Sequence, residues 1–226
     1  MANCKNCGSG GFLQSMDRNG LCKRCAYPVI SDIQQRARII DDCVRLAQEG
    51  KTYATRLSRH ELLIEQLELL LVYERKGIPT LSPNPSELIE RMGGYRGTIV
   101  AEEIEKIADK AKKQAELTAN VTPKFNALTK ALLKVQEILD VEGQSISEHH
   151  TAIELRLLMH KAKIEGFVTE ARKAEFKGNS KRAIDQYKEA LFYIKNDDID
   201  DDLQIELITN IESKLSELEG AGNLLK

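Results

Sequence analysis

Four of the chain's five cysteines lie within its first 25 residues, in the pattern Cys4-x2-Cys7-x14-Cys22-x2-Cys25. Each CxxC pair places two thiolates on one tight turn, and two pairs supply the four sulfur ligands that a tetrahedral zinc ion prefers. Because protein atoms then fill every coordination position, none remains open for water or substrate. The pattern therefore predicts a structural Zn²⁺ site rather than a catalytic one.

Two other kinds of cysteine chemistry fit this pattern less well. A redox-active CxxC belongs to a strand-to-helix turn, whereas the chain beyond residue 28 has the periodicity of helices. An iron–sulfur cluster also takes four cysteines, but paired CxxC turns are the more ordinary arrangement for zinc. A segment of about 25 residues buries too little surface to fold alone, so metal binding must supply its folding free energy.

The cysteine segment is also basic. Four cations against the single Asp17 give residues 1–28 a formal charge of +3: Lys5, Arg18, Lys23 and Arg24. These side chains are candidate contacts to nucleic acid or to a protein partner, with Phe12 and Tyr27 available for stacking. The alternative is that they are solvated and offset the charge of an anionic zinc-tetrathiolate.

Composition and charge exclude several classes of function. The 226 residues carry a formal charge of −2, so the whole chain has no basic field to hold it on nucleic acid or an anionic membrane. The longest apolar run covers residues 69–73, far short of the roughly 20 that span a bilayer, and no signal-peptide core is visible. We therefore expect a cytoplasmic protein. No Ser/His/Asp set or phosphate-binding loop is recognisable, so we also expect it not to be an enzyme.

Two other residues with reactive side chains have ordinary structural explanations. Cys43 falls on the apolar stripe of an expected helix and is interpreted as a small buried hydrophobe. His160 lies between Leu157 and Ile164 on a helical seam, which favours a hydrogen-bonded interior or interface residue.

A turn and a helix must position the metal ligands. Residues 17–20, Asp-Arg-Asn-Gly, suit a hairpin turn, with residues 20–22 as its returning strand. A helix should then begin close to Cys25 or Pro28. From Val29 onward apolar residues recur at three- and four-residue spacing, which predicts a mainly α fold.

Helix signals subdivide the remaining chain. Ser58 and Glu61 predict a capping box that opens a helix running to Gly77, and Thr122 and Pro123 predict an N-cap followed by a first helical residue. Helices at 99–118 and 123–141 share a heptad-like seam and form either a hairpin or one kinked rod. The predicted units are a zinc knuckle (1–28), a helical hairpin (29–76), a Pro/Gly-containing connector with a short helix (77–94), a coiled-coil-like hairpin (95–143), a tetratricopeptide-like helical bundle (144–219) and a tail (220–226). The connector is also the best candidate for a domain boundary.

The cysteine segment resembles a known class of zinc domains. The order CxxCG, hairpin, GLCxxC and then helix is similar to treble-clef and zinc-ribbon domains, and to short LIM-like knuckles of uncharacterised bacterial and phage proteins. In treble clefs the second ligand pair sits at the first turn of a helix, which implies that Cys22 and Cys25 adjoin the helix after them. Because these families bind DNA, RNA or protein, the resemblance implies metal ligands and no particular activity.

The C-terminal part loosely resembles a tetratricopeptide repeat. Ala183, Tyr187 and Ala190 match the second helix of such a repeat, and Ala171 matches the small position of the first. The match is partial, because Lys195 stands where the family has Pro and one unit is visible. A three-helix module of the microtubule-interacting-and-trafficking type is an equally loose match, and a plain three-helix bundle is the alternative.

The features together favour a non-enzymatic zinc-binding protein that acts as a protein–protein interaction or scaffold module. The heptad seams and the broadly apolar helix at 58–76 favour pairing with itself or with another protein. The alternative is a nucleic-acid-binding regulator that uses the basic knuckle.

Overall fold

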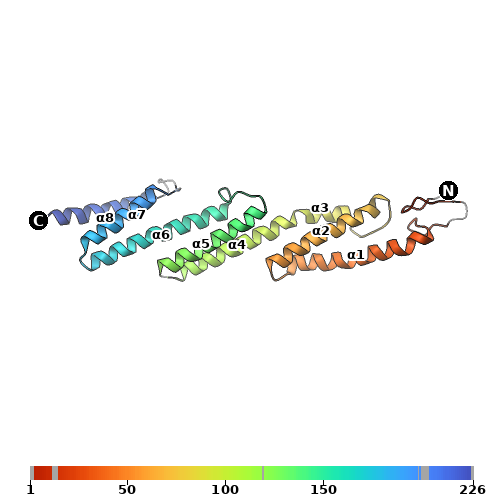
Figure 1. The fold of residues 1–226 in the computed structure, drawn as a ribbon, viewed down its shortest axis with the longest axis horizontal. Coiled ribbons are helices and arrows are strands. Elements are labelled where there is room, and N and C mark those ends of the chain that lie inside the picture. Colours follow the sequence, from red (N-terminus) through yellow and green to blue (C-terminus); the bar gives the residue numbers. More distant parts are fainter. Residues whose placement is uncertain (1–2, 12–14, 119, 198, 200–203, 225–226) are drawn as a thin grey trace. The chain divides into compact units, whose positions relative to one another are not determined.

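The computed structural model describes residues 3–11, 15–118, 120–197, 199 and 204–224. This part of the chain is mainly helical, which confirms the expected fold class. The helices follow one another along the chain (Figure 1): α1 (Lys23–Glu49), α2 (Tyr53–Arg75), α3 (Pro85–Gly93), α4 (Tyr95–Glu116), α5 (Val121–Val141), α6 (His150–Phe176), α7 (Ser180–Lys195) and α8 (Ile205–Leu224). Within the described ranges, no helix combines the length and apolar character that crossing a bilayer would require.

Two compact units divide the chain, Met1–Glu103 and Ile104–Lys226. The division falls within α4, later than the connector at 77–94 that the sequence favours as a boundary. The short helix of that connector, α3, packs against α2 and so belongs to the first unit.

The first unit is built on an antiparallel hairpin of α1 and α2. The Tyr73 hydroxyl donates to the Asp32 carboxylate (2.9 Å) near one end of the pair, and the Arg56 side chain donates to the Ala47 carbonyl oxygen (2.9 Å) near the other. Buried apolar side chains of this unit form one core, which includes residues of the cysteine segment: Cys4, Leu21, Cys22, Val29, Ile33, Ile40, Cys43, Leu63, Leu67, Leu70 and Ile78. The cysteine segment is therefore continuous with the helical core.

The start of α1 lies earlier than the sequence signals indicate. The helix begins at Lys23 and continues through Pro28, instead of starting near Cys25 or Pro28. Pro28 lies beyond the first turn, where a proline removes the hydrogen bond to the carbonyl oxygen four residues earlier and normally disfavours a helix, which is why the sequence favours a later start. Residues 20–22, expected as a returning strand, form only an isolated bridge between Met16 and Cys22.

The start of α2 is also displaced, because a different side chain caps it. Thr52 is the N-cap and accepts a hydrogen bond from the Thr55 N–H (3.2 Å), so the helix begins at Tyr53. The capping box expected at Ser58 and Glu61 is wrong, since both residues lie inside the helix. Ser58 donates instead to the Thr55 carbonyl oxygen (3.1 Å).

The helices at the start of the second unit form a hairpin rather than a kinked rod. α4 and α5 run side by side (Figure 1), and residues of both helices line one groove. Asn120 is the N-cap of α5, so Thr122 and Pro123 lie inside the first turn and not at the predicted cap. The buried residues keep the expected heptad-like spacing, with Ile104, Ala108, Ala111 and Ala115 on α4 and Leu128, Val135 and Leu139 on α5.

Helices α6, α7 and α8 pack in sequence order. The small residues Ala171, Ala183 and Ala190 are fully buried, and the buried Tyr187 donates its hydroxyl to the Glu175 carboxylate (2.7 Å). α7 has the predicted bounds, whereas α8 extends to Leu224, so residues 220–224 continue a helix instead of forming a tail.

Candidate metal centre

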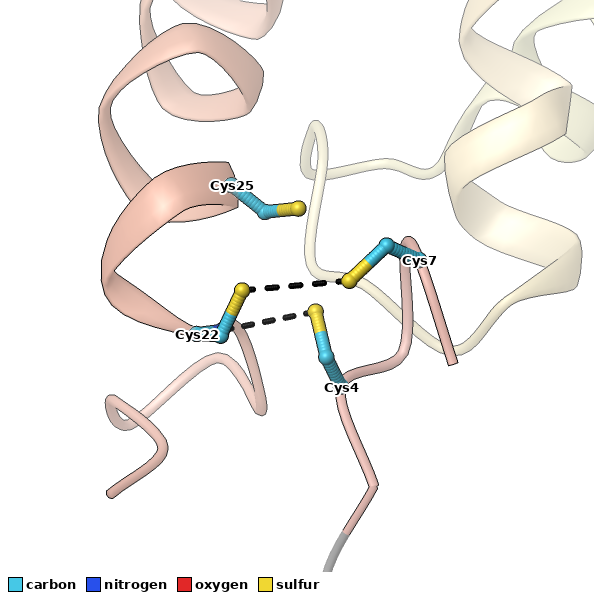
Figure 2. Close-up of side chains that lie close together, drawn as sticks. All are labelled: Cys4, Cys7, Cys22 and Cys25. Carbon is cyan, nitrogen blue, oxygen red and sulfur yellow. Dashed lines mark hydrogen bonds between the residues drawn. The ribbon is translucent and has the colours of Figure 1, made fainter. Parts of the chain in front are cut away.

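The first CxxC pair lies on a tight turn before α1. The Gly8 N–H donates to the Cys4 carbonyl oxygen (2.8 Å), and the Cys4 N–H donates to the Ser9 carbonyl oxygen (2.9 Å). Gly8 has a φ of 74°, in the left-handed region that residues with a Cβ rarely adopt, which explains a glycine directly after the second cysteine. The turn directs the sulfurs of Cys4 and Cys7 toward the second pair (Figure 2).

The second CxxC pair is positioned by the turn at residues 17–20 and by the start of α1. The Gly20 N–H donates to the Asp17 carbonyl oxygen (3.0 Å), which closes the predicted turn. Cys22 is the N-cap of α1, and Cys25 lies in its first turn with its N–H donating to the Cys22 carbonyl oxygen (2.9 Å). The second ligand pair therefore adjoins the helix that follows, as expected.

The four sulfur atoms gather at the spacing of a tetrahedral metal site. All four Sγ atoms lie within 4.8 Å of one another, and those of Cys7 and Cys22 are 3.8 Å apart. Four sulfurs bound at about 2.3 Å to one tetrahedral ion stand about 3.8 Å from each other. Within the described part of the chain, this is the only group of three or more Cys, His, Asp or Glu side chains placed to hold a metal ion.

Hydrogen bonds favour the thiolate form at the first pair. The pKa of the Cys4 thiol is lowered to about 6, mainly by a hydrogen bond from the Cys7 backbone N–H and then by one from the Cys22 backbone N–H. The Cys22 backbone nitrogen lies 3.4 Å from the Cys4 Sγ. The Ser9 hydroxyl lies 2.7 Å from the Cys7 Sγ and lowers the pKa of Cys7. Both sulfurs are thus prepared to act as anionic ligands.

At the second pair the pKa of the Cys25 thiol is raised, and a bound cation would favour its thiolate form. A hydrogen bond from Asn6 lowers the pKa of Cys25, but the sulfur of Cys7, burial and the remaining thiols outweigh it and raise the pKa to about 11. Adjacent thiolates repel one another, so the metal-free cluster retains a proton that a bound cation would displace. The donor set therefore fits a soft divalent cation, to which all four cysteines would be ligands.

Hydrogen bonds from two lysines connect the cysteine segment to the end of α2. The Lys5 Nζ donates to the Gly77 carbonyl oxygen (2.5 Å), and the Lys76 Nζ donates to the Asn6 side-chain oxygen (2.9 Å) and carbonyl oxygen (3.3 Å). We call these contacts the lysine latch. The Lys5 side chain crosses Gly20 so closely that a Cβ at this position would lie 2.8 Å from its Cδ and Cε atoms.

The four basic residues singled out in the sequence therefore differ in their surroundings. Lys5 belongs to the lysine latch, whereas Arg18, Lys23 and Arg24 are exposed. Tyr27 is 81% exposed in the second turn of α1, and Phe12 lies outside the described residues. The structure thus leaves three of the four cations available to a partner.

The remaining candidates lie away from the cysteines. Cys43 is buried in the α1–α2 core, and burial raises the pKa of its thiol, as expected for a residue that packs as a small hydrophobe. The His160 Nδ1 lies 3.4 Å from the Asp197 carboxylate, whose side chain is almost fully buried. This pair is an interior contact of the second unit.

Sequence reasoning missed Asn6, Lys76 and Gly77 as neighbours of the metal centre. Their contacts join residues about 70 positions apart, and no local pattern marks such pairs. The one available signal was Gly77 as the end of a helix. Its N–H donates to the Glu74 carbonyl oxygen (2.8 Å), which is part of the motif that ends α2.

Comparison with models of protein families, with curated proteins and with solved structures finds no match to this chain. The treble-clef and tetratricopeptide resemblances accordingly stay hypotheses. Conclusions about function depend on the cysteine cluster and on the surfaces of the helices.

Proposed function

We propose that this chain is a non-enzymatic zinc-binding protein, in which zinc is structural and the helical body binds a protein partner. The observation that carries the proposal is the closed set of four cysteine sulfurs within 4.8 Å of one another. Four protein ligands satisfy a tetrahedral zinc ion and leave no position for a substrate. In this proposal Cys4, Cys7, Cys22 and Cys25 form a treble-clef-like knuckle.

Packing around the cluster supports a structural role for the metal. Cys4 and Cys22 are buried and contact the core of the α1–α2 hairpin, and the lysine latch holds the same segment on the end of α2. Zinc would fix the knuckle and thereby the start of α1. A reducing compartment such as the cytoplasm would keep the thiols available as ligands.

Exposed apolar side chains support the interaction role. Phe176 is 94% exposed and Phe192 67% exposed in the tetratricopeptide-like part, and Leu133 is exposed on α5. Single exposed apolar residues are common, but aromatic side chains are enriched where proteins bind one another. A scaffold that presents helix faces to peptides or partner helices accounts for these residues.

Metal analysis of the purified chain tests the zinc centre. We expect one zinc per chain in the wild type and none in the double variant Cys4→Ser, Cys7→Ser. Cys43→Ala is the matched control, because Cys43 lies in the core and outside the cluster. Full zinc content in the double variant, or iron in place of zinc in the wild type, would contradict the proposal.

A capture experiment from the native host tests the interaction role. We expect the wild-type chain to retain a specific protein, which is identified and then shown to bind the purified chain directly. Failure of the purified pair to associate would remove the support for a scaffold.

A second candidate function is nucleic-acid binding by the knuckle, and the exposure of Arg18, Lys23 and Arg24 favours it. A gel shift at increasing salt distinguishes the two functions, because binding through phosphate contacts weakens steeply with salt. Salt-sensitive binding that is lost on replacing these three residues by Glu would favour the regulator.

A further inference from the structure

We propose that the groove between α4 and α5 binds an acidic amphipathic helix of a protein partner. This inference rests on the proposed interaction function and assigns it a surface and a kind of ligand. The groove has a volume of about 680 Å³ and lies entirely in the second unit, between residues 107–114 of α4 and residues 122–137 of α5.

The shape of the groove suits a helix. Ala111, Ala127 and Ala131 line it with small side chains, and the larger apolar residues Ile107 and Leu133 also line it. Small side chains at a contact allow helix axes to approach to about 8–10 Å. The stretch of α5 that lines the groove is about 22 Å long at 1.5 Å per residue, which matches a ligand helix of about four turns.

The charges that line the groove are predominantly positive. Lys110, Lys130 and Lys134 stand against the single Glu137, and no ion pair of these three lysines is present in the described part of the chain. Lys130 and Lys134 are four residues apart on one helix face, an arrangement that is mildly destabilising in isolation. An acidic ligand would remove this repulsion.

Another face of the same hairpin shows how such a ligand would bind. Lys112 of α4 donates to Glu154 (2.6 Å), and Lys124 of α5 donates to Glu165 (2.6 Å), and both glutamates belong to α6. The α4–α5 hairpin thus already holds one helix through lysine–glutamate pairs that flank a packed apolar seam. On the groove face the lysines and the apolar residues are present, and the acidic helix is the missing component.

Other occupants fit the groove less well. A second copy that docked through the same groove would bring Lys110, Lys130 and Lys134 against their own equivalents, so like charges would oppose self-association. Single-stranded nucleic acid is bound on aromatic stacking platforms, whereas none of the described residues that line the groove is aromatic. A partner helix with acidic flanks is therefore the occupant that matches both shape and charge.

Two synthetic peptides test the inference on the whole 226-residue chain loaded with zinc. The probe is a fluorescein-labelled helical peptide of about 18 residues with Leu and Ala on one face and Glu on the flanks, and its counterpart has Lys at every Glu position. We expect fluorescence anisotropy to show binding of the acidic peptide and at least tenfold weaker binding of the basic one.

The double variant Lys130→Glu, Lys134→Glu locates the site. We expect it to weaken binding of the acidic peptide about tenfold, because two attractive contacts become repulsive. The matched control Lys51→Glu, Lys181→Glu makes the same change in net charge at exposed positions outside the groove and should bind like the wild type. Circular dichroism establishes that both variants remain folded.

Three results would overturn the inference: no binding of the acidic peptide, equal binding of both peptides, or an equal loss in the groove variant and the control. Light scattering adds a fourth, since a wild-type dimer that the groove variant dissociates would assign the groove to a second copy of the chain. Each of these results would leave the zinc content and the direct association with a captured partner unchanged. Failure of the groove is therefore distinguishable from failure of the proposed function.

Discussion

The substitution Lys5→Met measures how strongly the metal centre is coupled to the end of α2. Met keeps the apolar stem that crosses Gly20 and removes only the ammonium group, which lies 2.5 Å from the Gly77 carbonyl oxygen. That oxygen follows the last turn of α2, where the helix end attracts cations. Because both groups are exposed, water replaces the lost hydrogen bond, and we expect a cost of about 1 kcal/mol.

Zinc affinity reports this cost, because Lys5 lies on the same turn as Cys4 and Cys7. Competition with a chromophoric chelator at low salt should show zinc binding weakened about fivefold, since 1.4 kcal/mol corresponds to tenfold. At about 1 M salt the difference should shrink, because the Debye length falls to about 3 Å. Lys51→Met, which removes an exposed lysine between α1 and α2, is the matched control and should leave the affinity unchanged.

The coupling would be refuted if Lys5→Met and Lys51→Met gave the same zinc affinity. A salt-independent loss would refute the electrostatic part of the argument and assign the effect to packing of the stem over Gly20. The second contact of the lysine latch provides a further check, because Lys76→Met should weaken zinc binding in the same direction.

Three further predictions concern the metal ligands and the second unit. Zinc affinity should rise about tenfold per pH unit for each proton displaced, because the pKa of Cys25 is raised to about 11 and its thiol is protonated in the metal-free chain. Chelator competition measures this affinity, and a flat profile between pH values of about 6 and 8 would contradict the prediction. Ala190→Leu should lower the free energy of unfolding by about 1–3 kcal/mol in urea, because Ala190 is fully buried, and it should leave the zinc content unchanged. Burial, and then the contact with Glu175, raise the pKa of Tyr187 to about 12. The contribution of Tyr187 to stability should therefore be fully present below a pH of about 10 and be lost as pH rises toward 12. Thermal melts across this range should show a smaller loss for Tyr187→Phe, and an identical loss would show that other groups cause it.

The metal ligands were predictable because their geometry is local. Each CxxC pair is confined to one turn, and among the described residues of this segment Gly8 and Gly20 stand at the two positions where the backbone has a positive φ. Helical periodicity was equally informative, since burial of Ala183, Tyr187 and Ala190 follows from spacing on one helix. Short-range patterns therefore carried both predictions.

Helix starts were harder to predict, because several side chains compete as caps. Thr52 and Ser58 are both good N-cap residues, and the sequence alone favours Ser58 on account of Glu61. The structure selects Thr52, and the added turn places Arg56 where it donates to the Ala47 carbonyl oxygen. The contact of Arg56 with α1 therefore accompanies the use of Thr52 as the N-cap, and local sequence signals do not indicate that contact.

Long-range contacts were not predictable, and they change the interpretation of the basic residues. Lys5 counted as a candidate partner contact because it lies beside Cys4 in a basic segment, yet it contacts a carbonyl oxygen 72 positions away. Nothing in the sequence indicated that Lys110 and Lys130 line the same groove, because only the side-by-side placement of α4 and α5 brings them together.

Division of the chain into two compact units has a consequence for any zinc-dependent behaviour. The cysteine cluster and the lysine latch lie in Met1–Glu103, whereas the groove lysines lie in Ile104–Lys226, and each unit has buried apolar residues of its own. Loss of zinc should therefore unfold structure locally, beginning at the knuckle and the start of α1. Hydrogen exchange on the Cys4→Ser, Cys7→Ser variant should show lost protection there and retained protection in α5 to α7. Zinc would thus govern what the first unit presents to a partner, and the groove would stay competent to bind its helix.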